Sequence, residues 1–201
     1  MLVIAYCLIW PRTKDLEVII DNSLHFYEHI SIITGRAHAR AYIIHKCYIY
    51  RNTQPLVRRF VAYVRPILEY TSSTWSPSTI TNIKMVDSVQ KRFTKRLKRL
   101  HKVDYQNRLI TLGLNSLELR RLSAGLTLTY KILFGLIDVD PTQLFNIYNC
   151  PPLHGHIYSL HCNTQRLNTG HHLFSSHVIA PCNSLPIDVF LLKVWTVSNY
   201  R

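Results

Sequence analysis

The sequence predicts a mainly α-helical protein, a small helical bundle with a short N-terminal β element and an irregular C-terminal segment. Apolar residues recur at intervals of three and four through most of residues 24–136, which is the spacing of one helix face. A β-branched run precedes them at residues 14–21, and residues 141–170 show neither period. We therefore expect a β element within residues 1–21, a helical domain at 22–137 and a partly irregular segment at 138–201.

The first half of the predicted bundle contains two apolar stripes with a break between them. An Asp-Asn-Ser cluster at residues 21–23 can cap the first turn of a helix predicted for residues 24–50. A second stripe follows Pro55, a residue that suits the first turn of a helix. Because proline cannot donate a backbone hydrogen bond, we expect a kink or an end near Pro66. Trp75 should anchor the connector that follows.

A further helix is predicted in the middle of the chain. Asn115 with Glu118 three residues later resembles a capping box, and leucines at helical spacing continue the pattern towards Leu136. Asp138 and Asp140 then precede a proline. A turn that ends the helix explains these two carboxylates better than a metal site does.

Residues 83–103 are the most strongly patterned stretch, a basic amphipathic helix that Thr81 or Asn82 can cap. At about 100° per residue, its apolar residues fall within an arc of roughly 120° and its basic residues within a separate arc of roughly 160°. Asp87 is its one acid, so like charges repel unless an anion lies beside this face. The basic residues are Lys84, Lys91, Arg92, Lys95, Arg96, Lys98, Arg99 and Lys102.

Three interpretations of this basic face stay open. It can bind a polyanion such as duplex nucleic acid, which carries one phosphate charge per about 1.7 Å of axis. It can be a solvated surface, or it can lie on anionic lipid. The net charge of +13 is concentrated in residues 1–102, which carry 17 Lys and Arg against 6 Asp and Glu, whereas residues 103–201 carry 7 against 5. This asymmetry favours a polyanion.

The composition is that of a globular domain with a core. The chain has 201 residues, of which 47% are hydrophobic and 17% charged, and this excludes a disordered tail. The five cysteines form no Cys-x-x-Cys motif, so we expect a reducing intracellular compartment, cytoplasm or nucleus. The apolar residues 1–10 lack the basic flank of a signal peptide and are too short to span a bilayer. We expect either a buried strand or a frayed, wrongly assigned start of the chain there, and no transmembrane segment.

Seven segments in a fixed order resemble the downstream part of the reverse transcriptase of non-LTR, LINE-type retrotransposons of the jockey-like sort. Together they cover nearly everything from Lys14 to about Val189. The family commonly has a glycine where this chain has Glu17 and a tryptophan where it has Cys182. The segments are residues 15–30, 36–41, 60–77, 88–97, 105–122, 130–136 and 177–186.

The resemblance implies a palm end at residues 15–21, followed by a helical thumb that grips the template–primer duplex. It also implies an RNA-directed DNA polymerase whose full-length form would use Mg²⁺. Nucleotidyl transfer needs convergent carboxylates that hold two metal ions, and the family carries a pair of them in a Tyr/Phe-Ala-Asp-Asp turn. This chain has no Asp-Asp dipeptide. We therefore expect a truncated, catalytically incomplete fragment that has no cofactor and is inactive alone.

The expected partner is an RNA–DNA or DNA duplex, bound without sequence preference and chiefly through phosphate contacts. No small-molecule substrate is expected, and the oligomeric state is left open. The alternatives are a structural helical remnant without a ligand and a basic peripheral membrane-binding protein. The primary nucleic-acid-binding candidates are Lys84, Lys91, Arg92, Lys95, Lys98, Arg99 and Lys102, and the secondary candidates are Arg36, Arg40, Arg58, Arg59 and Arg65.

Other kinds of site find little support in the sequence. Between Cys150 and Cys182 the chain is rich in His and Cys, but the spacings fit none of the standard zinc arrangements. We predict no metal site. A Gly-x-Ser-x-Gly motif and a Gly-rich phosphate loop are both lacking, so a hydrolase or a nucleotide-triphosphate enzyme of those types is not expected.

Overall fold

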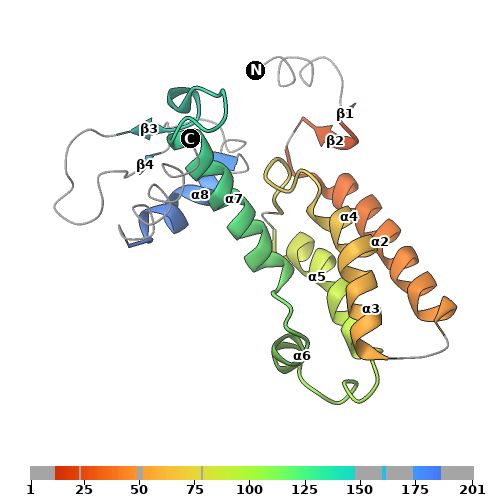
Figure 1. Cartoon of the computed structure of the whole chain (residues 1–201). Helices are drawn as coiled ribbons and strands as arrows, with labels where there is room; N and C mark the ends of the chain where they lie inside the picture. Colours follow the sequence, from red (N-terminus) through yellow and green to blue (C-terminus); the bar gives the residue numbers. More distant parts are fainter. Residues whose placement is uncertain are drawn as a thin grey trace. The chain divides into compact units, whose positions relative to one another are not determined.

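The computed structural model of the chain describes residues 12–22, 24–48, 52–77, 79–147, 160–161 and 174–186. These residues are mainly helical and begin with a short antiparallel sheet (Figure 1), as the sequence predicts. The chain divides into two compact units, Met1–Ala124 and Gly125–Arg201. The strand expected within residues 1–10 lies outside the described residues.

The predicted β-rich run is folded into a hairpin of strands β1 (Arg12–Asp15) and β2 (Val18–Asp21). Leu16 and Glu17 form the turn with φ angles of 44° and 66°. Both angles lie in the left-handed region, where a residue with a Cβ is strained and glycine is not. Val18 and Ile20 point into the core, because alternate residues of a strand face the same side.

Helix α2 (Tyr27–Cys47) forms the centre of the first unit. The carboxylate of Asp21 accepts the backbone N–H groups of His25 and Phe26 just before the helix begins. The stripe predicted from the sequence is buried, and α2 packs through it against α5 (Ile80–Lys95) and against the helix segments before α5. Its members are Ile30, Ile33, Ala37, Ala41 and Ile44.

The second apolar stripe forms a helix with an irregular middle. Helix α3 (Thr53–Arg59) continues as a π-helical turn η1 (Phe60–Val64) and then as α4 (Arg65–Glu69). The break lies directly before Pro66, where the sequence predicts one, because proline has no N–H for the helical ladder. Trp75 is fully buried and donates its indole N–H to the carbonyl of Tyr70 at 2.7 Å, so it anchors the connector as expected.

The basic helix differs from the prediction at both ends. Thr79, rather than Thr81 or Asn82, caps α5 by accepting the N–H of Asn82. The helix ends at Lys95 and not near residue 103. Residues 96–103 form successive turns in which Leu97 and Leu100 stay buried. Repulsion between like charges destabilises a helix over these residues by a few tenths of a kcal/mol per pair. The turns bury both leucines, so a continuous helix is not needed to keep them in the core.

One further helix and the first turns of another complete the first unit. Asp104 caps α6 (Tyr105–Leu112) by accepting the N–H of Gln106, and Ser116, rather than the predicted Asn115, caps α7 (Leu117–Leu133). Gly113 ends α6 with φ 62°, a left-handed conformation that glycine adopts freely.

The second unit has a small core of its own. It contains the later turns of α7, the 3-10 turn η2 (Pro141–Gln143), the short strands β3 (Asn146–Ile147) and β4 (Leu160–His161), and α8 (Phe174–Asn183). Asp140 caps η2 through the N–H of Thr142, so this carboxylate serves a turn. Cys182 is 2% exposed, so this position is buried in the core. The members of this core are Phe145, Leu160, Val178 and Cys182.

Candidate nucleic-acid interface

One face of α5 is exposed and basic. On a helical projection its exposed residues fall within an arc of about 120°, and the buried residues Val86, Val89 and Phe93 lie opposite. Within the exposed arc, Lys84, Lys91 and Lys95 differ by no more than about 40° in direction. We call these three residues the α5 cation row. The exposed arc also contains Ile80, Thr81 and Arg92.

The α5 cation row has no ionic partner among the described residues. The ion pairs there involve Arg12, Lys14, Arg65 and Arg120 instead. Lys91 has an aromatic neighbour, because its ammonium lies 5.1 Å from the ring centroid of Tyr105. Exposed cations in a row that form no ion pair create a surface that attracts an anion.

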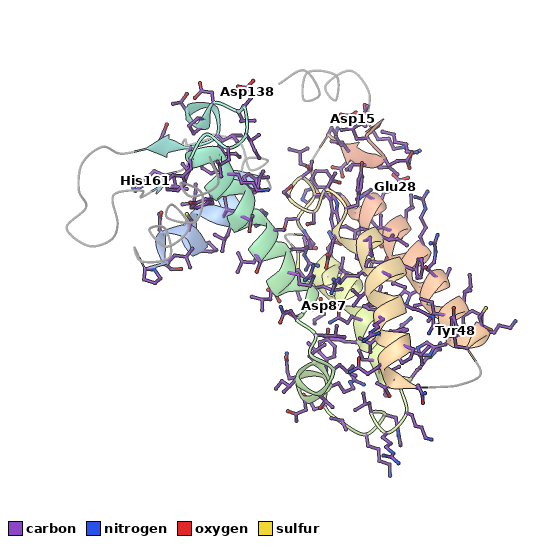
Figure 2. The ribbon with its side chains drawn as sticks, in the orientation of Figure 1. Asp15, Glu28, Tyr48, Asp87, Asp138 and His161 are labelled. Carbon is purple, nitrogen blue, oxygen red and sulfur yellow. The ribbon has the colours of Figure 1, made fainter. Side chains whose placement is uncertain are left out.

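The one acid of α5 lies outside the exposed arc. Asp87 is 9% exposed and is labelled on α5 in Figure 2. Burial raises the pKa of its carboxyl, and the nearby cations Arg121 and Lys91 oppose that rise. Arg121 is itself buried. The carboxylate of Asp87 therefore offsets a buried guanidinium, and only one member of the row lies close to it.

Three predicted cations follow α5 rather than belong to it. Lys98, Arg99 and Lys102 are exposed on the turns of residues 96–103. Arg99 has φ 67°, a left-handed conformation that does not continue a right-handed helix. These side chains therefore extend the basic surface beyond the end of α5, but they do not continue one straight helix face.

The seam between α2 and α5 brings additional cations together. His38 of α2 lies 3.1 Å from the hydroxyl of Ser88 on α5, measured from Nε2. Burial lowers the pKa of His38, and the guanidinium groups of Arg92 and Arg96 lower it further. Both arginines are therefore close to α2. The sequence placed Arg96 in the basic arc but gave no reason to pair it with α2, because that proximity depends on helix packing.

The secondary candidates have different surroundings. Arg36 and Arg40 are exposed, but each lies about 160° around α2 from His38, so they do not share the seam with α5. Arg58 is exposed on α3. The guanidinium of Arg59 stacks 3.5 Å from the ring centroid of Tyr48.

Arg65 is held within the fold rather than displayed on the surface. Its Nε lies 3.5 Å from a carboxylate oxygen of Glu69, and its side chain is 21% exposed. Burial lowers the pKa of Arg65, as does the neighbouring Arg120, while Glu69 opposes them. A guanidinium that is already paired with a carboxylate is less available to a phosphate.

A metal centre is not visible in the described part of the chain. No group of three or more His, Cys, Asp or Glu residues in that part could hold an ion. Most of the His- and Cys-rich stretch, from 148 to 159 and from 162 to 173, lies outside the described residues. Among the described helices, none is long and apolar enough to cross a membrane.

Comparison with known proteins adds a distant relative. Over 130 residues, the chain is 24% identical to an uncharacterized protein of Caenorhabditis elegans, and the match covers 63% of this chain and 66% of the relative. No family model matches the chain, and no solved structure matches it. The name of the relative states no activity.

Proposed function

We propose that the chain binds nucleic-acid duplexes without reading their sequence, through the exposed cations of α5 and the turns that follow it. The observation that carries this proposal is the α5 cation row, whose exposed ammonium groups have no ionic partner among the described residues. The stretch from 88 to 103 contains seven Lys and Arg residues and no acid. Such a surface suits phosphate contacts, which position a protein on a duplex without specifying bases.

The dimensions of the row agree with a duplex backbone. From Lys84 to Lys95 the helix rises by about 16 Å, at 1.5 Å per residue. Over that distance a duplex presents about nine phosphates, counting both strands. Long lysine side chains can adjust to this spacing without base-edge hydrogen bonds.

We further propose that the chain corresponds to the palm end, thumb and C-terminal segment of a non-LTR retrotransposon reverse transcriptase. The seven ordered segments support this, and so do the mainly helical fold and the hairpin whose turn has a left-handed backbone at Glu17, where the family commonly has glycine. In this proposal the duplex is the template–primer. The chain itself supplies no Asp-Asp pair, so we expect binding without polymerisation.

A charge-reversal experiment tests the duplex interface. The row variant carries Lys84→Glu, Lys91→Glu and Lys95→Glu, and binding of fluorescent RNA–DNA and DNA duplexes of random sequence is measured by anisotropy from 50 to 300 mM salt. We expect the row variant to lose binding. For the wild type, the slope of the logarithm of the binding constant against the logarithm of the salt concentration should include about −2.7 from the row. This value corresponds to three neutralised phosphates at about −0.9 for each.

A matched control separates the row from net charge alone. The control variant carries Arg36→Glu, Arg40→Glu and Arg58→Glu, which changes the net charge by the same amount at exposed positions away from the row. We expect it to bind within a few-fold of the wild type. Equal losses in the two variants, or duplex binding by the row variant at wild-type strength, would contradict the assignment. Vesicles of anionic lipid in the same buffer should bind more weakly than duplex.

A further inference from the structure

A surface pocket opens between the C-terminal halves of α2 and α5. Its volume is about 420 Å³, and its lining residues are Tyr42, His45, Lys46 and Arg96. The ring of His45 packs on Phe93 of α5, with 4.5 Å between the ring centroids. The pocket therefore lies where the two helices are held together. Its size is within the range of about 300–1,000 Å³ that is typical of small-molecule sites.

Two cations from different helices meet at this pocket. Lys46 comes from the last turn of α2, and Arg96 follows the last residue of α5. The segments that contribute them, residues 29–68 and 88–103, contain no Asp or Glu. Each helix C-terminus offers only about half a negative charge, which does not balance a lysine and an arginine. The pocket is therefore positive.

An aromatic ring lies beside the cations. Tyr42 lines the pocket and is 54% exposed, so part of its side chain is accessible to a ligand. Aromatic side chains next to basic groups bind single-stranded nucleic acids, because the ring stacks on a base and the cations hold the phosphate. A phosphate monoester carries a charge of about −1.5 to −2 at pH 7, which two cations can balance. A phosphodiester carries a single negative charge and would leave one of the two cations unbalanced.

We propose that this pocket binds a nucleoside monophosphate, with Lys46 and Arg96 on the phosphate and Tyr42 stacked on the base. The pocket volume exceeds what a phosphate ion alone needs and leaves room for a sugar and a ring. The ligand can be a free nucleotide or the phosphorylated end of a strand. The strand-end form rests on the proposed function, whereas binding of the free nucleotide does not.

Isothermal titration of the full chain with adenosine 5′-monophosphate tests the proposal, with adenosine and inorganic phosphate as partial ligands. The pocket variant carries Lys46→Gln and Arg96→Gln, and we expect its affinity for the nucleotide to fall about tenfold or more. Tyr42→Ala should weaken nucleotide binding about fivefold and leave phosphate binding unchanged. Tyr42→Phe, which keeps the ring, should bind as the wild type does.

The matched control is Lys84→Gln with Lys95→Gln, which removes the same charge from the α5 cation row. This control should bind the nucleotide normally and bind duplex weakly. An equal loss of nucleotide binding in the two variants, or an unchanged affinity in the pocket variant, would overturn the proposal. So would a failure of the wild type to bind the nucleotide. Circular dichroism establishes that each variant is folded.

Two oligonucleotides test whether the pocket binds the phosphorylated end of a strand as well as a free nucleotide. A single-stranded 12-mer with a 5′-phosphate should bind more tightly than the same 12-mer with a 5′-hydroxyl, and the pocket variant should lose that difference. Equal binding of the two oligomers would refute the strand-end form. Nucleotide binding by a chain that binds no duplex would refute the proposed function and support the pocket, so the two failures are distinguishable.

Discussion

Glu69 holds together two helix segments that are distant in sequence, and its replacement should be costly. Its carboxylate accepts two hydrogen bonds from Arg120, from Nε and from Nη2 at 2.9 Å, and lies 3.5 Å from Nε of Arg65. The hydrogen bond that Arg120 donates to Glu69 raises the pKa of Arg120. Replacing Glu69 with Gln leaves two guanidinium groups facing each other without an anion between them.

The loss in the free energy of unfolding can be calculated approximately from the exposure of the three side chains. They are 23%, 21% and 32% exposed for Glu69, Arg65 and Arg120, so water screens the charges only in part. Hydrogen bonds to charged groups contribute about 1.5–3 kcal/mol each when partly buried, and breaking a pair leaves a charge uncompensated. We expect Glu69→Gln to lower the free energy of unfolding by about 2 kcal/mol.

A double-mutant cycle with Arg120→Gln isolates the pair. Urea unfolding followed by far-UV circular dichroism gives the free energies, and we expect a coupling of about 1–2 kcal/mol. Lys84→Gln serves as the control and should change stability by less than about 0.5 kcal/mol, because Lys84 is exposed and unpaired among the described residues. A loss below about 0.5 kcal/mol for Glu69→Gln, or a coupling near zero, would refute the reasoning.

Three further predictions concern backbone strain, pH and thiol reactivity. Glu17→Gly should raise the melting temperature by a few degrees because φ is 66° there; an unchanged or lower value would contradict the strain. Burial lowers the pKa of His29, so stability should be full above about pH 6.5 and fall as the pH drops towards the folded-state pKa; His29→Gln should flatten that decline in urea titrations. Burial raises the pKa of Cys182 to about 11, so mass spectrometry after brief iodoacetamide treatment should find that exposed Cys47 is modified before Cys182.

Much of the fold could be predicted because it follows from spacing along the chain. The apolar stripe of α2 and the break at Pro66 both appear where residue periodicity and proline chemistry place them. The end of α5 could not be predicted in this way. Lys and Arg are good helix formers, so local preference continues the helix past Lys95, whereas burial of Leu97 and Leu100 is met by turns.

The candidate interface divides in the same way. The surplus of cations and their separation from the apolar face of α5 are properties of the sequence. The pair of Arg65 with Glu69 is local as well, because the two residues are four positions apart on α4. The stacking of Arg59 on Tyr48 and the position of the seam between α2 and α5 are not local, because both depend on contacts between different helices. Lys46 was missed for this reason, and Arg96 was placed in the basic arc but was not paired with α2. The absence of acids from residues 29–68 and 88–103 is the sequence signal that the two cations share.

By itself, the sequence determined the helical class, the buried faces of α2 and α5, and a positive charge without local compensation. Each of these depends on residue type and on neighbours within a few positions. Only the tertiary structure decided where the basic helix ends, which cations share a surface and which are already paired. Those outcomes depend on contacts between residues such as Glu69 and Arg120, which are 51 positions apart, and no local pattern encodes them.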